Sequence, residues 1–155
     1  DRGKWGINFS MTKSEVEKCI KKLACSNDIN IYYIKYEGLN FVNSFHKDFG
    51  KFTLKKYAKL LAKLNIRYKS VLNIIDFDTN KLPRDYYIYN NTRSKFHVFE
   101  NNKKPDEPKY ITLQVTKKKL GETMMVSYET ENWGKNLLFQ LNQKKSREQK
   151  YMDDL

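Results

Sequence analysis

The chain has 155 residues, with 30 Lys or Arg against 18 Asp or Glu, which gives a formal net charge of +12. This length predicts one domain with a single core, and a content of 39% hydrophobic residues excludes a disordered chain. No apolar run reaches the roughly 18 residues that a membrane-spanning helix needs. The positive charge makes anionic partners the leading class: nucleic acid, anionic lipid or an acidic protein.

The N-terminal segment predicts a short strand followed by a helix. Apolar residues alternate with small or polar ones over 5–9, as they do in a strand. Thr12 and Glu15 have the spacing of a capping box, and the apolar residues after them recur at helical intervals. We therefore expect the helix to cover residues 13–24.

Two strands joined by a turn are expected next. Residues 29–37 are apolar or aromatic on both alternating faces, so we expect both faces of this strand to be partly covered. Gly38 predicts a turn, and residues 39–45 form a second and weaker strand pattern.

The most clearly amphipathic segment follows Gly50. Thr53 is a suitable N-cap, and the pattern predicts a helix over 53–64 with lysines on the side opposite its apolar stripe. The residues expected in the buried stripe are Leu54, Tyr57, Leu61 and Leu64.

Strand patterns dominate the second half of the chain. Turn-forming residues separate short apolar runs, and Leu120-Gly121 predicts the turn of a hairpin. The expected strands cover 71–77, 86–90, 95–100, 110–116 and 123–129.

The C-terminal segment predicts one more helix, capped by Thr130 and bearing Trp133 in its apolar stripe. We expect residues 1–142 to form one domain, and residues 143–155 to form a charged helical extension or a disordered tail. The fold class that follows is α+β, with a single antiparallel or mixed sheet, two helices in the N-terminal half and one C-terminal helix.

Cys19 and Cys25 are the two cysteines of the chain. Two thiols are too few for a disulfide scaffold, and they have no zinc-site spacing with histidine. We expect each to be a small hydrophobic residue in or near the core, in a reduced intracellular compartment, cytoplasm or nucleus. No cofactor and no metal are expected.

A basic helix face is the first candidate site. Lys55, Lys59 and Lys63 recur every four residues and so lie along one line of the helix, where they can neutralise phosphates of a nucleic-acid backbone. An ordinary solvated helix face is the alternative. The phosphate-contacting candidates are Lys55, Lys56, Lys59, Lys63, Arg67 and Lys69.

Aromatic residues near the first strands add a stacking surface. Tyr33 and Tyr36 lie among basic residues, and aromatic side chains on an open sheet stack single-stranded bases. The predicted β-α-β-β-α-β order of the first half resembles an RNA-recognition fold, although the glycine-aromatic strand motif of that family is missing. The alternative is that these aromatic side chains pack in the core.

Asp76 and Asp78 stand two apart at the end of an apolar strand, and His97 follows on a later strand. This pattern resembles the first two motifs of archaeo-eukaryotic primase-polymerases. The resemblance implies metal binding by the two acids, phosphate contact by His97, and a third acid supplied by Glu129 or Glu131. Acid pairs at strand ends are also common turn formers, and we expect that role here.

A basic turn and a basic tail form the alternative interaction surface. The terminal strands and helix are similar to the end of a pleckstrin-homology domain, which implies binding of anionic lipid headgroups by basic residues in strand loops. An acidic protein is the other partner that this surface suits. Its residues are Lys117, Lys118, Lys119, Lys144, Lys145 and Arg147.

The sequence therefore predicts a non-catalytic, basic α+β domain that binds single-stranded RNA or DNA through phosphate contacts and aromatic stacking. An interaction module for anionic lipid or an acidic protein is the first alternative. A metal-dependent nucleotidyl transferase using Asp76, Asp78 and His97 is the second.

Overall fold

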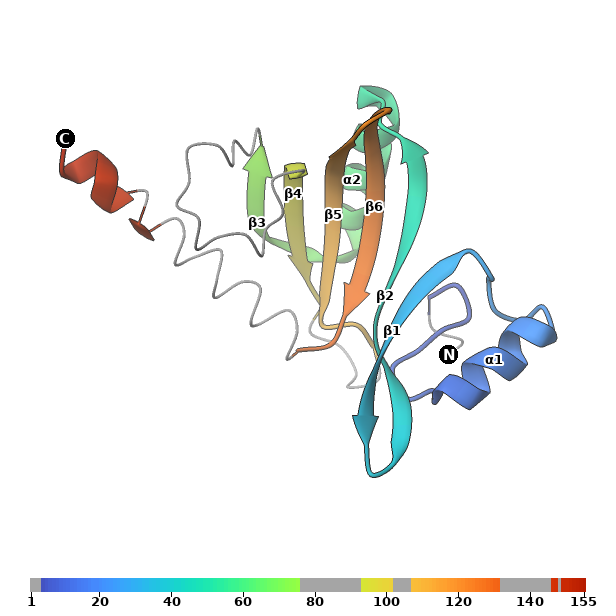
Figure 1. Cartoon of the computed structure of the whole chain (residues 1–155). Helices are drawn as coiled ribbons and strands as arrows, with labels where there is room; N and C mark the ends of the chain where they lie inside the picture. The colour runs from blue at the N-terminus through green and yellow to red at the C-terminus, as the bar shows by residue number, and fades with distance from the viewer. Residues whose placement is uncertain (1–3, 76–92, 102–106, 132–145, 148) are drawn as a thin grey trace.

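A computed structural model of the chain defines the fold (Figure 1). It describes residues 4–75, 93–101, 107–131, 146–147 and 149–155, with side chains not described at 72–75 and 93–94. The predicted hairpin strand 86–90, Asp76, Asp78 and the predicted helix after Thr130 fall outside these residues. None of the helices within the described ranges has the length and apolar character needed to cross a membrane.

The architecture is α+β with one antiparallel six-stranded sheet, two helices in the N-terminal half and a short helix near the C-terminus, as the sequence predicts. Residues 146–147 and 149–153 are helical and exposed. The other elements are α1 (Lys13–Lys21), β1 (Ile29–Tyr36), β2 (Leu39–Lys51), α2 (Leu54–Arg67), β3 (Lys69–Ile75), β4 (Arg93–Glu100), β5 (Tyr110–Lys118) and β6 (Gly121–Glu129).

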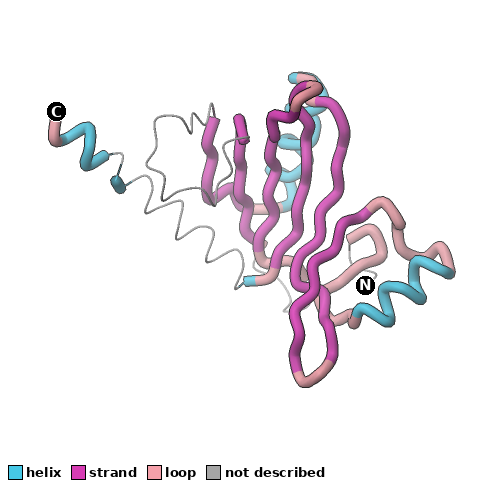
Figure 2. Tube along the Cα trace, viewed as in Figure 1, coloured by secondary structure: helices cyan, strands magenta, loops and turns pink. Residues whose placement is uncertain are grey.

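The strand order across the sheet is β1-β2-β6-β5-β4-β3, and every neighbouring pair is antiparallel (Figure 2). The chain passes from β2 to the far edge of the sheet through α2. It then returns strand by strand from β3 to β6, which pairs with β2. Residues that are far apart in the sequence are thereby brought together on β2, β6 and β5.

The predicted N-caps Thr12 and Thr53 are confirmed. The Thr12 hydroxyl accepts a hydrogen bond from the Glu15 amide at 3.2 Å, and the Glu15 carboxylate accepts one from the Thr12 amide at 3.4 Å. The Thr53 hydroxyl accepts from the Lys56 amide at 3.2 Å. Each cap supplies a partner to an amide that the first turn of a helix leaves unpaired.

The apolar stripe of α2 is only partly as predicted. Tyr57 and Leu64 are buried and Leu61 is half-buried, but Leu54 is 73% exposed. Leu54 is the first residue of the helix, and its side chain therefore lies beyond the edge of the packed surface.

The strand predicted over residues 5–9 is wrong, because the chain forms a tight turn there. The amides of Lys4 and Ile7 each donate to the other residue's carbonyl oxygen at 2.9 Å. Trp5 and Gly6 between them have φ of 56° and 84°, a conformation that a strand cannot contain. The turn places the Trp5 ring edge-on to Tyr128 in the core, with 5.0 Å between ring centroids.

The two cysteines form a disulfide with each other, which corrects the expectation of two separate buried thiols. Helix α1 ends at Lys21, and Leu23 then takes a φ of 58° that reverses the chain. The amides of Ala24 and Cys25 both donate to the Cys19 carbonyl oxygen, at 3.0 and 3.3 Å. This reversal brings Cys25 back beside Cys19, where the two form the disulfide.

The core lies between one face of the sheet and the elements that cover it, which are α2, α1 and the N-terminal turn. Cross-strand pairing sets that face, because residues directly opposite each other point the same way. Leu113 on β5 pairs with Val126 on β6 and with His97 on β4, and all three are buried. Residues one position further along each strand point to the second face, where the sheet is polar.

Candidate functional site

Polar side chains occupy the middle of the sheet face that lies opposite α2. Pairing places Ser44 on β2 opposite Glu129 on β6, and Ser127 opposite Thr112 on β5. Gln114 lies two residues beyond Thr112 and therefore on the same face. All five are buried, which is unusual for polar residues in the centre of a sheet.

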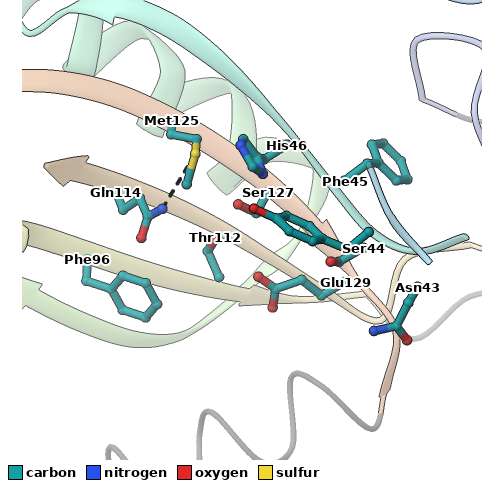
Figure 3. Close-up of a pocket in the computed structure, with 11 residues that line it drawn as sticks. Asn43, Ser44, Phe45, His46, Phe96, Thr112, Gln114, Met125, Ser127 and Glu129 are labelled. Atoms are coloured by element: carbon teal, nitrogen blue, oxygen red, sulfur yellow. Dashed lines mark hydrogen bonds between the residues drawn. The ribbon is translucent and has the colours of Figure 1, made fainter. Parts of the chain in front are cut away.

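A pocket of about 270 Å³ opens over these residues (Figure 3). Its lining comes from five strands that span most of the sheet. The ring of Phe45 belongs to the core on the other face and lies apart from the other side chains. The lining residues are Tyr32, Asn43, Ser44, Phe45, His46, Phe96, Thr112, Gln114, Met125, Ser127 and Glu129.

Gln114 is the most informative of the lining residues, because it is 4% exposed and its amide oxygen has no hydrogen-bond partner. Its amide nitrogen contacts the Met125 sulfur at 3.7 Å, which is a weak interaction for an amide donor. Glu129, 2% exposed, brings a carboxyl group to the same pocket. At one end, Asn43 is fixed by the Thr130 hydroxyl, which donates to its side-chain oxygen at 3.0 Å.

Two rings lie at the β1 side of the pocket. Tyr32 and His46 have ring centroids 5.7 Å apart and planes tilted by 30°. Burial lowers the pKa of His46, and the nearby Asp48 carboxylate only partly opposes that shift. The imidazole is therefore neutral near pH 7, and the pocket wall carries no positive charge from this residue.

The basic residues predicted to contact nucleic acid are all exposed on α2 and at the start of β3. They are Lys55, Lys56, Lys59, Lys63, Arg67 and Lys69. Within the described ranges none of them forms an ion pair with an acidic residue. The Lys56 ammonium group donates a hydrogen bond to the Phe49 carbonyl oxygen, so one of its donors is already used within the protein.

The predicted stacking residues do not join that basic face. Tyr33 is half-buried against the core, with the Lys13 ammonium 5.7 Å from its ring centroid. Tyr36 is exposed at the end of β1, beside the turn to β2. This turn is at the bottom of the view in Figure 1, whereas α2 lies behind the upper part of the sheet.

The structure places two of the residues proposed for metal-dependent chemistry, His97 and Glu129, on opposite faces of the sheet, and Asp76 and Asp78 lie outside the described residues. His97 is 3% exposed on the α2 face, with its ring centroid 5.5 Å from that of Tyr57. Cross-strand pairing places Glu129 and Glu100 on the same face of the sheet. Glu100 is three positions from His97 on β4, and side chains alternate between the two faces along a strand. Glu129 and His97 therefore lie on opposite faces. Among the described residues, no group of three or more His, Cys, Asp or Glu could hold a metal ion.

The alternative lipid surface is partly described. Lys117 and Lys118 end β5, Lys119 follows in the turn, and all three are exposed. The Lys118 ammonium lies 3.8 Å from the Asp48 carboxylate, so part of this charge is compensated. Arg147 is exposed in the C-terminal helix, and Lys144 and Lys145 lie outside the described residues.

Sequence reasoning misses the pocket, although part of its pattern is visible in the chain. Thr112 and Gln114 alternate with Ile111, Leu113 and Val115, so β5 has one polar and one apolar face. The hairpin around Leu120-Gly121 also fixes which residues of β6 lie opposite Thr112 and Gln114. The contribution of β2 depends on its pairing with β6, which no local pattern indicates. No protein-family model, curated protein or solved structure matches the chain.

Proposed function

We propose that the protein is a small-molecule-binding domain whose site is the polar pocket on the sheet. The observation that carries this proposal is that Gln114 lines the pocket and that its buried amide oxygen has no hydrogen-bond partner. A buried acceptor left unpaired costs about 1–3 kcal/mol. A bound molecule that donates to it would remove that cost.

The composition of the lining supports binding. Ligand pockets combine apolar and aromatic walls with a few polar groups that fix orientation. Here Phe96 and Met125 supply apolar surface, while Ser44, Thr112 and Ser127 supply hydroxyl groups. The volume of about 270 Å³ equals that of roughly nine water molecules at about 30 Å³ each, so the ligand is small.

The test uses two expected effects of the unpaired Gln114 oxygen: it favours ligand binding, and it lowers the stability of the protein without ligand. Gln114→Met keeps a similar side-chain volume and removes the unpaired oxygen. We expect this variant to unfold at a higher temperature and to lose binding in a ligand-observed NMR screen of small fragments. Thr116→Val, on the same face of β5 but outside the pocket, is the matched control and should keep fragment binding. A destabilised Gln114→Met variant that binds the same fragments would contradict the proposal.

Nucleic-acid binding through α2 is a second candidate. The specific observation that favours it is the line of exposed cations Lys55, Lys59 and Lys63, which form no ion pair with a described acid. The net charge of +12 adds long-range attraction to a phosphate backbone. Stacking by Tyr33 or Tyr36 is not supported, because both belong to β1, and the β1–β2 turn lies at the end of the molecule away from α2 in Figure 1.

The intracellular location stays a prediction, and the Cys19–Cys25 disulfide weighs against it. Disulfides persist in oxidising compartments and are rare in the cytosol. Free-thiol labelling of protein isolated from its native cells would distinguish the two locations.

A further inference from the structure

We infer that one end of the molecule binds the surface of an anionic lipid bilayer and inserts two leucines, Leu54 and Leu120, into its apolar layer. This end consists of residues 48–56 and 117–123, and we call it the leucine–lysine tip. The inference goes beyond the proposed function, because no residue of the tip is among the described residues that line the pocket.

Backbone pairing brings the β5–β6 turn beside the chain that leads into α2. The last residues of β2 pair with the first residues of β6, and the Phe52 amide donates to the Glu122 carbonyl oxygen at 2.7 Å. Leu54 follows Phe52 by two positions, and Leu120 precedes Glu122 by two. The β5–β6 turn and the start of α2 are both at the top of the view in Figure 1. The two leucines therefore belong to the same end of the molecule.

Both leucines contribute little packing to the fold. Lys118 pairs with Gly121, which leaves Lys119 and Leu120 as the turn residues, and the Leu120 side chain is fully exposed. Leu54 is 73% exposed in the first turn of α2. A single exposed leucine is ordinary on a protein surface, whereas exposed apolar residues gathered at one place mark interaction sites. A leucine that passes from water into the boundary of a bilayer gains the free energy of apolar transfer.

Lysines outnumber acidic residues around the two leucines. The tip contains six lysines and two acids, Asp48 and Glu122. Asp48 compensates part of this charge, because its carboxylate lies 3.8 Å from the Lys118 ammonium group. Each lysine held close to an anionic leaflet strengthens binding by about fivefold. The six lysines are all exposed: Lys51, Lys55, Lys56, Lys117, Lys118 and Lys119.

The leucines favour a bilayer over a nucleic acid as the anionic partner of the tip. Phosphates of a nucleic acid are contacted by Lys and Arg, and its bases stack on aromatic rings, so exposed aliphatic side chains have no part in either contact. A bilayer presents anionic headgroups directly above an apolar layer. It therefore offers a partner to the lysines and to the leucines at once.

Co-sedimentation of the whole chain with lipid vesicles tests the inference. One set of vesicles is phosphatidylcholine with about 30% phosphatidylserine, and the other is phosphatidylcholine alone, both at about 0.15 M salt, where the Debye length is about 8 Å and distant charges are screened. We expect binding to the anionic vesicles to be at least about tenfold tighter, since several lysines each contribute about fivefold.

The leucine variants separate insertion from attraction between charges. Leu120→Gln should weaken binding to the anionic vesicles by about tenfold, and Leu54→Gln should weaken it several-fold, because each removes apolar transfer and leaves the charge unchanged. Ile66→Gln is the matched control. Ile66 is 85% exposed near the other end of α2, so its replacement should leave binding unchanged.

The lysine variants test the electrostatic part. Replacing Lys117 and Lys119 together by Gln should weaken binding by about tenfold or more. Lys21→Gln, at the end of α1, removes an exposed charge far from the tip and is the matched control. It should leave binding nearly unchanged.

Four results would overturn the inference. The first is no binding to the anionic vesicles. The second is binding that Leu120→Gln and Leu54→Gln leave unchanged, since diffuse attraction needs no leucine. The third is an equal loss in Ile66→Gln. The fourth is binding of a single-stranded oligonucleotide, without vesicle binding, that the lysine variant weakens and Leu120→Gln does not, which would make the tip a nucleic-acid surface. The fragment screen with Gln114→Met tests the pocket separately.

Discussion

The ring centroids of Tyr32 on β1 and His46 on β2 lie 5.7 Å apart, and both side chains line the pocket. The edge strand β1 therefore forms part of the pocket wall. β1 begins at Ile29, a few residues after the Cys19–Cys25 disulfide. The N-terminal segment, with its turn at Trp5 and its disulfide, thus holds the strand that supplies one side of the pocket. Stability in this segment and binding in the pocket are expected to be coupled.

Breaking the disulfide should therefore lower both stability and affinity. For the double variant Cys19→Ser and Cys25→Ser we expect the free energy of unfolding to fall by about 2 kcal/mol, the chain-entropy value for so short a loop. Urea denaturation measures this loss. A reducing agent should produce a similar loss in the wild-type protein and none in the double variant, and an unchanged denaturation midpoint would show that the bond adds nothing.

Two glycines allow a matched test of the N-terminal turn. Gly6 and Gly38 have nearly the same φ, 84° and 81°, so alanine costs about 1–2 kcal/mol of backbone strain at either. A Cβ at Gly6 would also stand 2.5 Å from the Ala24 carbonyl oxygen, whereas one at Gly38 would meet nothing within 4 Å.

Gly6→Ala should consequently destabilise the protein more than Gly38→Ala does. Thermal unfolding of both variants is the measurement, and we expect an additional loss of about 1–3 kcal/mol for Gly6→Ala from steric overlap. Equal losses would mean that the turn does not pack against the segment around Cys25.

Acidification should destabilise the protein through its histidines. Burial lowers the pKa of both His97 and His46 in the folded state, so below about pH 6.5 the unfolded chain binds protons that the folded chain does not. The free energy of unfolding therefore falls as the pH drops below that value, by up to about 1.4 kcal/mol per pH unit for each histidine.

His97→Phe is the variant that isolates this effect. Phenylalanine keeps a ring beside Tyr57 and cannot take up a proton, so stability should depend less on pH between 7.5 and 5. Urea midpoints across that range provide the measurement. A variant that loses stability on acidification as steeply as the wild-type protein does would show that His97 is not a source of the pH dependence.

Nucleic-acid binding, if α2 provides it, should depend steeply on salt. Neutralising about four phosphates on a single strand predicts that log K falls with log salt at a slope of about −3. Fluorescence anisotropy with a labelled oligonucleotide measures the slope. Lys59→Glu with Lys63→Glu should weaken binding without loss of helix, because both residues are exposed on α2.

The corresponding lipid test uses the β5–β6 turn. Co-sedimentation with anionic vesicles should respond to Lys117→Glu but not to Lys59→Glu if the turn is a lipid surface. Equal sensitivity at both positions indicates diffuse attraction to a protein of this charge. Binding to neither vesicles nor oligonucleotides would remove both anionic-partner hypotheses.

Local signals in the sequence are sufficient for much of the fold. The caps at Thr12 and Thr53 and the hairpin around Leu120-Gly121 each depend on neighbouring residues, and the structure has all three, with Lys119 and Leu120 as the turn residues. The exposure of Leu54 could not be predicted in this way, because helical periodicity does not indicate where the packed surface ends.

The pocket depends on long-range pairing, which explains why sequence reasoning misses it. Ser44 and Glu129 are 85 positions apart and become neighbours only when β6 pairs with β2. The residues between them carry no signal for that pairing. Charge is visible in the sequence without any pairing, so the sequence points to the basic face of α2 and not to the polar centre of the sheet.

Chemical-shift mapping tests the central claim most directly. We propose to titrate ¹⁵N-labelled protein with neutral, cationic and anionic fragments and to follow the backbone amides. The account predicts saturable shifts concentrated on the strands that line the pocket, including Ser44, Gln114 and Ser127, with α2 unchanged. Shifts confined to α2, or spread over the surface without saturation, would contradict the assignment of the pocket as the binding site.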